Sequence, residues 1–136
     1  MNGTGERAAS GLGGALRTIS AATAALVFVQ AALAGQWLAG HAQIIVTHGW
    51  IGNLAYLGAL ALVVIGVLLW RRGHGAGMAG LTLLLALLMT AQLGLGYVGR
   101  QQAWAAGVHI PGGVLISGLL VWIMANAWLR PAGRRG

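Results

Sequence analysis

The chain of 136 residues contains no cysteine, no lysine and a single acidic residue, Glu6. Without cysteine there is no disulfide, no thiolate metal site, no iron–sulfur cluster and no covalently attached c-type haem. Proton-coupled transporters commonly use buried Asp or Glu relays, and hydrolases need acid/base pairs that this chain does not supply. These absences argue against most hydrolytic and carboxylate-dependent transport functions.

The residues that are abundant are apolar, since 58% of the chain is hydrophobic and 7% is charged. Four stretches contain no Asp, Glu, Lys or Arg: residues 19–37, 44–70, 78–97 and 104–129. Each reaches the roughly 20 residues that a helix needs to cross the hydrocarbon core of a bilayer. The sequence therefore predicts an all-α integral membrane four-helix bundle, with residues 1–136 as one domain and lipid as its surroundings.

The eight arginines predict the orientation of the bundle, because seven of them flank the predicted helices on one side and only Arg100 lies between the last two. By the positive-inside rule both termini are cytoplasmic, in a multi-pass protein of a bacterial cell membrane. The net charge of +7 is then explained by topology, so no nucleic-acid partner is expected.

One alternative concerns the first apolar stretch, which resembles a secretory signal with the small residues Ala32 and Ala34 around a cleavage site. Cleavage would leave three helices. We expect the segment to be retained, because it has a counterpart later in the chain.

That counterpart belongs to an internal repeat of two helices. Gln30 precedes His48 by eighteen positions, and Gln92 precedes His109 by seventeen. Each repeat contains an even number of spans, so the two should be parallel and related by a pseudo-twofold axis along the membrane normal. This symmetry places His48 and His109 face to face at the same depth.

An imidazole in hydrocarbon is costly, and two at one depth can ligate one metal ion from opposite sides. A zinc site would usually need three or four protein ligands, so the two histidines favour haem b, with His48 and His109 as axial ligands of the iron. Gly52 and Gly113 follow these histidines by four residues and would present flat surfaces to a macrocycle. Close helix packing is the alternative explanation for the glycines.

Three polar residues are candidates for the outer edge of this cofactor site. Arg100 is the only cation on that side and could pair with haem propionates, with Gln102 as an additional donor. His41 lies seven positions before His48, about 10 Å higher on a helix, too far to share the iron but able to reach a propionate.

These features resemble the four-helix unit of haem A synthase, whose two homologous halves carry haem-ligating histidines on their second and fourth helices. The resemblance covers roughly residues 24–124 and is carried by His48 within the segment Thr47–Gly52 and by His109 within Val108–Gly113. Small bacterial four-span membrane proteins look similar. Ile45 and Gly49 stand where the synthase's catalytic half has a glutamate and an arginine.

The sequence therefore predicts a membrane b-type cytochrome for electron transfer or haem handling rather than an enzyme. Two alternatives stay open: a noncatalytic membrane subunit of a larger respiratory or transport complex, and a minimal haem A synthase-like enzyme acting as a homodimer. The partners that this prediction implies are haem, the lipid bilayer and a redox partner, a quinone or a larger membrane complex, and a homodimer is a further alternative.

Overall fold

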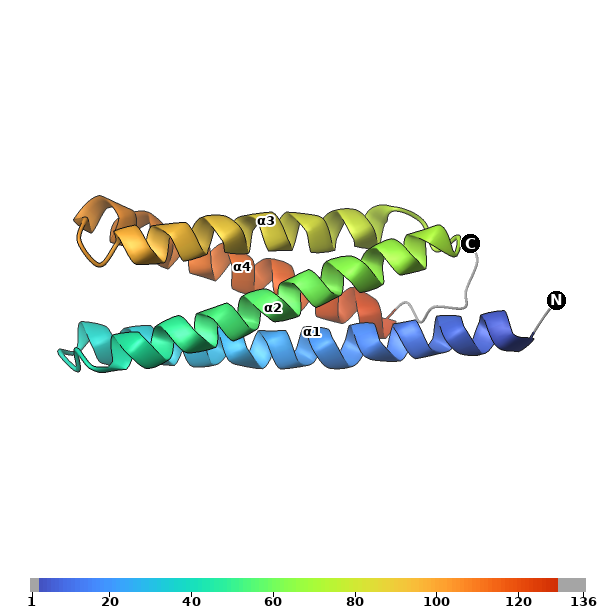
Figure 1. Cartoon of the computed structure of the whole chain (residues 1–136), viewed down its shortest axis with the longest axis horizontal. Helices are drawn as coiled ribbons and strands as arrows, with labels where there is room; N and C mark the ends of the chain where they lie inside the picture. The colour runs from blue at the N-terminus through green and yellow to red at the C-terminus, as the bar shows by residue number, and fades with distance from the viewer. Residues whose placement is uncertain (1–2, 130–136) are drawn as a thin grey trace.

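The computed structural model describes residues 3–129, with side chains from Ser10 onward. Four helices make up almost all of this range: α1 Gly3–Leu38, α2 Ile44–Arg71, α3 Gly77–Val98 and α4 Ala103–Leu129 (Figure 1). The described residues contain no strand. The bounds of α2, α3 and α4 agree with the predicted ranges to within one residue, which confirms the all-α prediction.

The first helix differs from its prediction, because it begins sixteen residues before Ile19. Arg7 and Arg17 were expected to precede the helix, and both lie within it. The expectation was wrong because the small residues that open the chain are helical even though they are not apolar. Arg17 packs its guanidinium over the ring of Trp128, 5.5 Å from the ring centroid, and so joins α1 to the end of α4.

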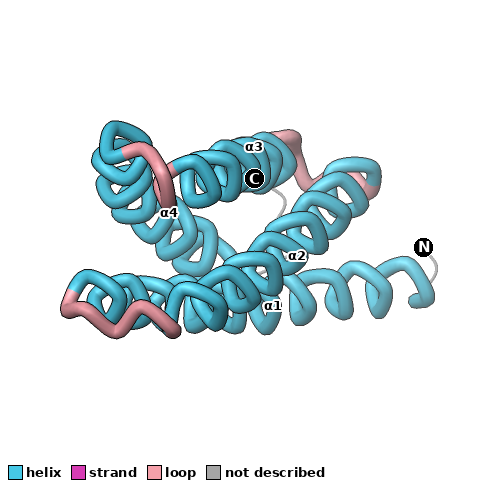
Figure 2. The backbone as a smooth tube through the Cα atoms, turned by 60° about the vertical axis from the view of Figure 1, so that its left-hand side comes forward, coloured by secondary structure: helices cyan, strands magenta, loops and turns pink. Residues whose placement is uncertain are grey.

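The helices alternate in direction and pack as a closed ring in which each helix touches two neighbours, α4 closing the ring against α1 (Figure 2). The diagonal pairs α1/α3 and α2/α4 have no Cα atoms within 8 Å of each other in the range 3–129. We call the end where α1 begins and α4 ends the terminal end, and the opposite end, with the turns 39–43 and 99–102, the histidine end.

The turn between α2 and α3 shows why glycine is needed at the terminal end. Gly73 has a φ of +86°, and its N–H donates to the carbonyl of Trp70 at 2.9 Å. The N–H of His74 donates to the carbonyl of Leu69 at 3.2 Å. This pair of bonds is a Schellman motif, which ends α2 and turns the chain back toward α3.

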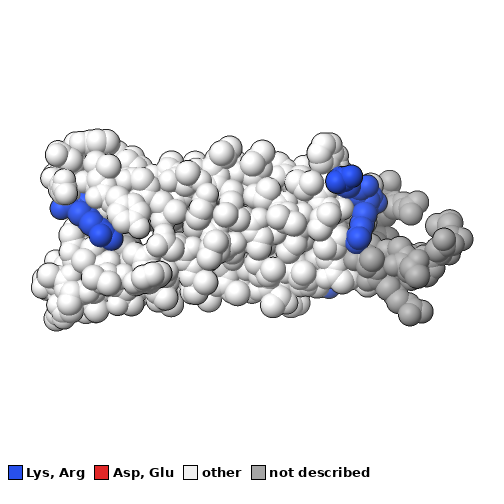
Figure 3. Space-filling model, viewed as in Figure 1, with Lys and Arg blue, Asp and Glu red and all other residues white. Residues whose placement is uncertain are grey.

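The outer surface is that of a membrane protein. All four helices contain spans long and apolar enough to cross a bilayer: Ser10–Leu38, Ile44–Arg71, Gly77–Val98 and Ala103–Leu129. Large apolar side chains face outward along the bundle, and basic side chains on the visible face lie only toward its two ends (Figure 3). The chain is therefore a multi-pass membrane protein.

The two-helix repeat is visible in the pattern of burial. Sixty-two positions separate Ser20 from Thr82, and both are fully buried and donate hydrogen bonds to carbonyls of their own helix. Sixty-one positions separate Leu62 from Ile123, and both are fully buried. The same offsets join Gln30 to Gln92 and His48 to His109. Equivalent positions of the two repeats therefore face the same interior.

The large side chains that are fully buried lie toward the terminal end. A Cβ atom at Gly66 would stand 3.1 Å from the Cα of Ala79, so α2 and α3 approach there as closely as their backbones allow. The largest side chains with less than 2% of their surface exposed belong to this half: Ser20, Thr23, Leu62, Thr82, Leu85, Leu120 and Ile123. The large buried side chains thus lie mainly in one half of the bundle.

Candidate functional site

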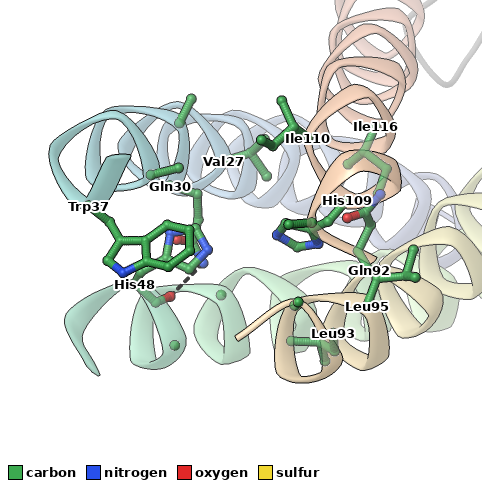
Figure 4. A pocket seen from close by; sticks show the side chains of 18 of the residues that line it. Val27, Gln30, Trp37, His48, Gln92, Leu93, Leu95, His109, Ile110 and Ile116 are labelled. Carbon is green, nitrogen blue, oxygen red and sulfur yellow. Dashed lines mark hydrogen bonds between the residues drawn. The ribbon is translucent and has the colours of Figure 1, made fainter. Parts of the chain in front are cut away.

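His48 and His109 face each other inside the bundle at the histidine end (Figure 4). His48 is the fifth residue of α2 and His109 the seventh of α4, so both lie within the first two turns of their helices. The centroids of the two rings are 6.2 Å apart, and the ring planes cross at 68°. The two imidazoles thus bridge two helices that share no close backbone contact. They lie opposite each other inside the bundle, as the repeat predicts.

A cavity of about 400 Å³ surrounds the two rings. All four helices contribute to its wall, which is mainly apolar; Val27 and Ala34 come from α1, Met89 and Leu93 from α3, and Ile110 from α4. Its volume falls in the range of about 300–1,000 Å³ that small-molecule sites occupy. The histidine end is therefore hollow where the terminal end is filled.

Two glutamines belong to this site. The side-chain Nε2 of Gln30 donates to the backbone carbonyl of His48 at 2.7 Å, and Gln92 lies beside His109 (Figure 4). Four buried side-chain atoms in the described residues have no hydrogen-bond partner: Nδ1 of His48, Nδ1 of His109, Oε1 of Gln30 and Oε1 of Gln92. Buried polar atoms are nearly always paired, so their concentration at one cavity makes this cavity the candidate functional site.

The glycines divide into those that make room for a side chain and those that face open space. A Cβ at Gly52 would collide with the amide of Gln30, and one at Gly112 would collide with the amide of Gln92. Gly113, which the sequence pairs with Gly52, lines the cavity and has no atom within 4 Å of its Cβ position. The spatial counterpart of Gly52 is therefore Gly112.

Gly96 on α3 has a further role that the sequence did not indicate. A Cβ atom there would stand 3.1 Å from Cε1 of His109, so the ring of His109 occupies the space that a side chain would need. Gly96 thus fixes how far the imidazole can lean toward α3.

Arg100 lies at the mouth of the cavity and contributes to its wall. Its guanidinium carbon is 5.0 Å from the ring centroid of Tyr97, and a Cβ at Gly49 would be 3.1 Å from the guanidinium nitrogen Nη2. The chain's only acidic residue is Glu6, and no carboxylate side chain occurs among those described, so no ion pair neutralises this charge there. The structure brings Arg100 to the histidines as the sequence predicts.

Two other candidates for the outer edge, His41 and Gln102, do not line the cavity. His41 is exposed in the turn before α2, and its carbonyl accepts the N–H of Ile44 at 3.1 Å. Gln102 is also exposed, and its carbonyl accepts the N–H of Ala105 at 3.1 Å at the start of α4. Both residues shape the turns through their backbones.

Comparison of the chain with protein-family models, with curated proteins and with solved structures found no match.

Proposed function

We propose that the protein is a membrane b-type cytochrome that holds one haem b between α2 and α4 through His48 and His109, for one-electron transfer or haem handling. The observation that carries the proposal is the meeting of two imidazoles, from helices on opposite sides of the bundle, across a cavity with unpaired polar atoms.

The separation of the rings fits two axial ligands of one iron. A metal–nitrogen bond of about 2 Å, added to about 1.1 Å from a ring nitrogen to the ring centre, puts the centroids of two opposed imidazoles about 6 Å apart. The observed distance is 6.2 Å. No group of three or more His, Cys, Asp or Glu side chains converges in the described residues, so a metal held by the protein alone would lack ligands. A macrocycle that contributes four nitrogens of its own needs only these two histidines.

The shape of the site supports a flat ligand. A plate between His48 and His109 would extend along the other diagonal, toward α1 and α3, and these helices do not approach each other closely in the part of the chain described. Ala31 and Ala34 line the cavity from α1, and their small side chains take up little of the space beside the rings. At the mouth, Arg100 provides a positive charge for the carboxylates that haem b carries at its edge.

The residues around the proposed haem would favour electron transfer over other haem reactions. Haem b with two imidazole ligands supplies a one-electron couple and no open coordination position. The mainly apolar wall would limit access of water to the haem, His48 and His109 would hold it, and the described side chains include no carboxylate that could act as an acid or base. A redox partner or a membrane quinone would then have to exchange the electron.

We further propose that the histidine end faces the outside of a bacterial cell membrane. Arg71 and Arg72 lie at the terminal end, where α1 begins and α4 ends, whereas Arg100 is the single arginine of the range 3–129 at the histidine end. This distribution favours a cytoplasmic terminal end by the positive-inside rule.

Absorption spectroscopy of the detergent-purified protein tests the cytochrome proposal. We expect about one haem per chain, with a low-spin bis-imidazole spectrum whose bands sharpen on reduction. Protein that is colourless after expression in haem-replete cells, and that also fails to bind added haemin, would refute the proposal. That outcome would favour a noncatalytic membrane subunit instead.

A further inference from the structure

The four unpaired atoms at the cavity divide into two acceptors and two donors. The oxygens Oε1 of Gln30 and Gln92 can only accept hydrogen bonds, and the two Nδ1 atoms can donate whenever they carry the ring proton. We propose that Nδ1–H of His48 donates to Oε1 of Gln30 and Nδ1–H of His109 donates to Oε1 of Gln92, making the glutamines positioning residues for both histidines. The inference rests on the proposed haem function and adds the groups that would orient and tune its ligands.

The protonation of the rings follows from ligation. A neutral imidazole carries one N–H, so a histidine that binds iron through Nε2 has its proton on Nδ1. A metal-bound histidine almost always donates that proton to a carboxylate, a carbonyl or water, and the partner raises the basicity of the ligand. This chain provides no carboxylate near the rings, so the amide oxygens are the unsatisfied acceptors within the described site.

The orientation of Gln30 supports the pairing in the first repeat. The backbone carbonyl of His48 can only accept, so the amide must present Nε2 to it, as it does at 2.7 Å. Oε1 is therefore the end of the amide that stays without a partner, in the same buried site as the unpaired Nδ1 of His48. One amide would then hold the backbone and the ring of His48 together.

The second repeat also places a glutamine amide against the helix that bears its histidine. The amide of Gln92 rests on the backbone of α4 at Gly112, three residues after His109, and lies beside the ring of His109 (Figure 4). Each glutamine already touches the helix that bears its histidine. The glycines at 52 and 112 are required for this, since a Cβ at either position would collide with the amide.

A competing acceptor exists on the same residues. The backbone of Gln30 lies close to the ring of His48, and the backbone of Gln92 lies close to the ring of His109. If the backbone carbonyls take the Nδ1 protons, then changing the glutamine side chains has no effect on the rings. A test of the proposal must separate these two acceptors.

The first experiment uses the haem-free protein in nanodiscs with ¹⁵N-labelled histidine. In the wild type we expect ¹⁵N chemical shifts of Nδ1-protonated rings for His48 and His109, assigned with His→Ala variants. Gln30→Met, which is similar in size and cannot accept in this way, should shift the signal of His48 alone, and Gln92→Met that of His109 alone. Unchanged shifts in both variants would overturn the proposal in favour of the backbone acceptors.

The second experiment measures the midpoint potential of the haem-loaded protein. Loss of the Nδ1–H acceptor makes the imidazole a weaker donor, so Gln30→Met and Gln92→Met should each raise the midpoint while keeping a low-spin spectrum. Gln30→Glu retains an acceptor oxygen and should bring the midpoint back toward that of the wild type. Equal midpoints in wild type, Met and Glu variants would overturn the proposal.

Gly52→Ala tests the same bond without changing the glutamine. The added methyl group displaces the amide of Gln30, so this variant should reproduce the His48 shift seen in Gln30→Met, whereas Gly94→Ala, which meets no atom within 4 Å, should not. A Gly52→Ala protein with wild-type His48 shifts would count against the proposal. Failure of the wild type to bind haem would refute the cytochrome function alone, because the NMR measurements on haem-free protein still decide the pairing.

Discussion

The two halves of the bundle are built on the same four helices and differ in how their interiors are filled. Toward the terminal end, Leu62, Leu85 and Ile123 are fully buried, and the buried hydroxyls bond to carbonyls of their own helices. At the histidine end the interior is a cavity of about 400 Å³ whose polar atoms are partly unpaired. The difference indicates that packing in the terminal half holds the helices together, so the other half can keep space and unsatisfied groups for a ligand.

The largest expected effect is on haem affinity, and it should come from replacing a histidine of the cavity. His48→Ala or His109→Ala should lower haem affinity by more than about 100-fold, since even residues that only support a metal ligand are worth about 10–100-fold. Haem content and the low-spin spectrum of the purified variants measure this. The stability of the haem-free bundle should not fall, because neither ring belongs to the packed core.

His41→Ala and His74→Ala are the matched controls, because both residues lie in turns outside the cavity. Both variants should retain the wild-type spectrum. If His74→Ala removed the haem and His109→Ala did not, the ligand assignment would be wrong.

A smaller effect, on the stability of the bundle and not on haem binding, should come from substitutions in the packed half. Leu62→Ala or Ile123→Ala should reduce the free energy of unfolding by about 1–3 kcal/mol, less than the about 2–5 kcal/mol of water-soluble cores, because lipid is itself apolar and mainly packing is lost. Unfolding in mixed micelles with increasing dodecyl sulfate provides the measurement. Haem per folded chain should stay near the wild-type value.

Leu87→Ala serves as the control for these core variants, because its side chain is 60% exposed on the outer face of α3. It should leave the unfolding curve close to that of the wild type. If Leu62→Ala emptied the haem site while the bundle stayed folded, the two halves would not be independent.

The smallest effect should come from Arg100→Ala, which removes a charge from the mouth of the cavity. A cation near the macrocycle favours reduced iron, so its loss should lower the midpoint potential modestly while the haem stays bound. The shift should be smaller at high salt, because screening acts over about 10 Å at 0.1 M ionic strength. Redox titration of wild type and variant at two salt concentrations measures both effects.

An unchanged or raised midpoint would remove Arg100 from the site. The proposed topology can be checked in parallel by labelling single cysteines placed at Gln101 and Gly75 in intact cells. An impermeant reagent should react at Gln101 only, and reaction at Gly75 instead would invert the orientation.

Much of the fold follows from the distribution of charge along the chain. The charge-free stretches give α2, α3 and α4 to within a residue, because the cost of a charge in hydrocarbon limits where a span can lie. The start of α1 was predicted too late in the chain. Hydropathy identifies the membrane-crossing part of a helix and gives no signal for helical turns that continue beyond it. The opposition of His48 and His109 was predictable from the repeat, since symmetry fixes both depth and direction.

The surroundings of the histidines were harder to predict, because side-chain direction depends on rotation about the helix axis as well as on depth. Each residue turns a helix by about 100°, so a position that is wrong by one residue faces another direction, and Gly112 rather than Gly113 meets Gln92. His41 was assigned to the face of His48 by helical spacing, but α2 begins only at Ile44, so that spacing does not apply. The recurrence of Gln30 as Gln92 was the available signal for the glutamines.

The placement of the two histidines on separate hairpins has a consequence for biogenesis. His48 belongs to the hairpin of α1 and α2, and His109 to the hairpin of α3 and α4. Helical hairpins can enter a bilayer one after the other, and a ligand held by both histidines can be captured only after the two have docked. Any such ligand adds its binding free energy to the docked form alone. Cofactor supply during synthesis would then set what fraction of newly inserted chains reaches the assembled state.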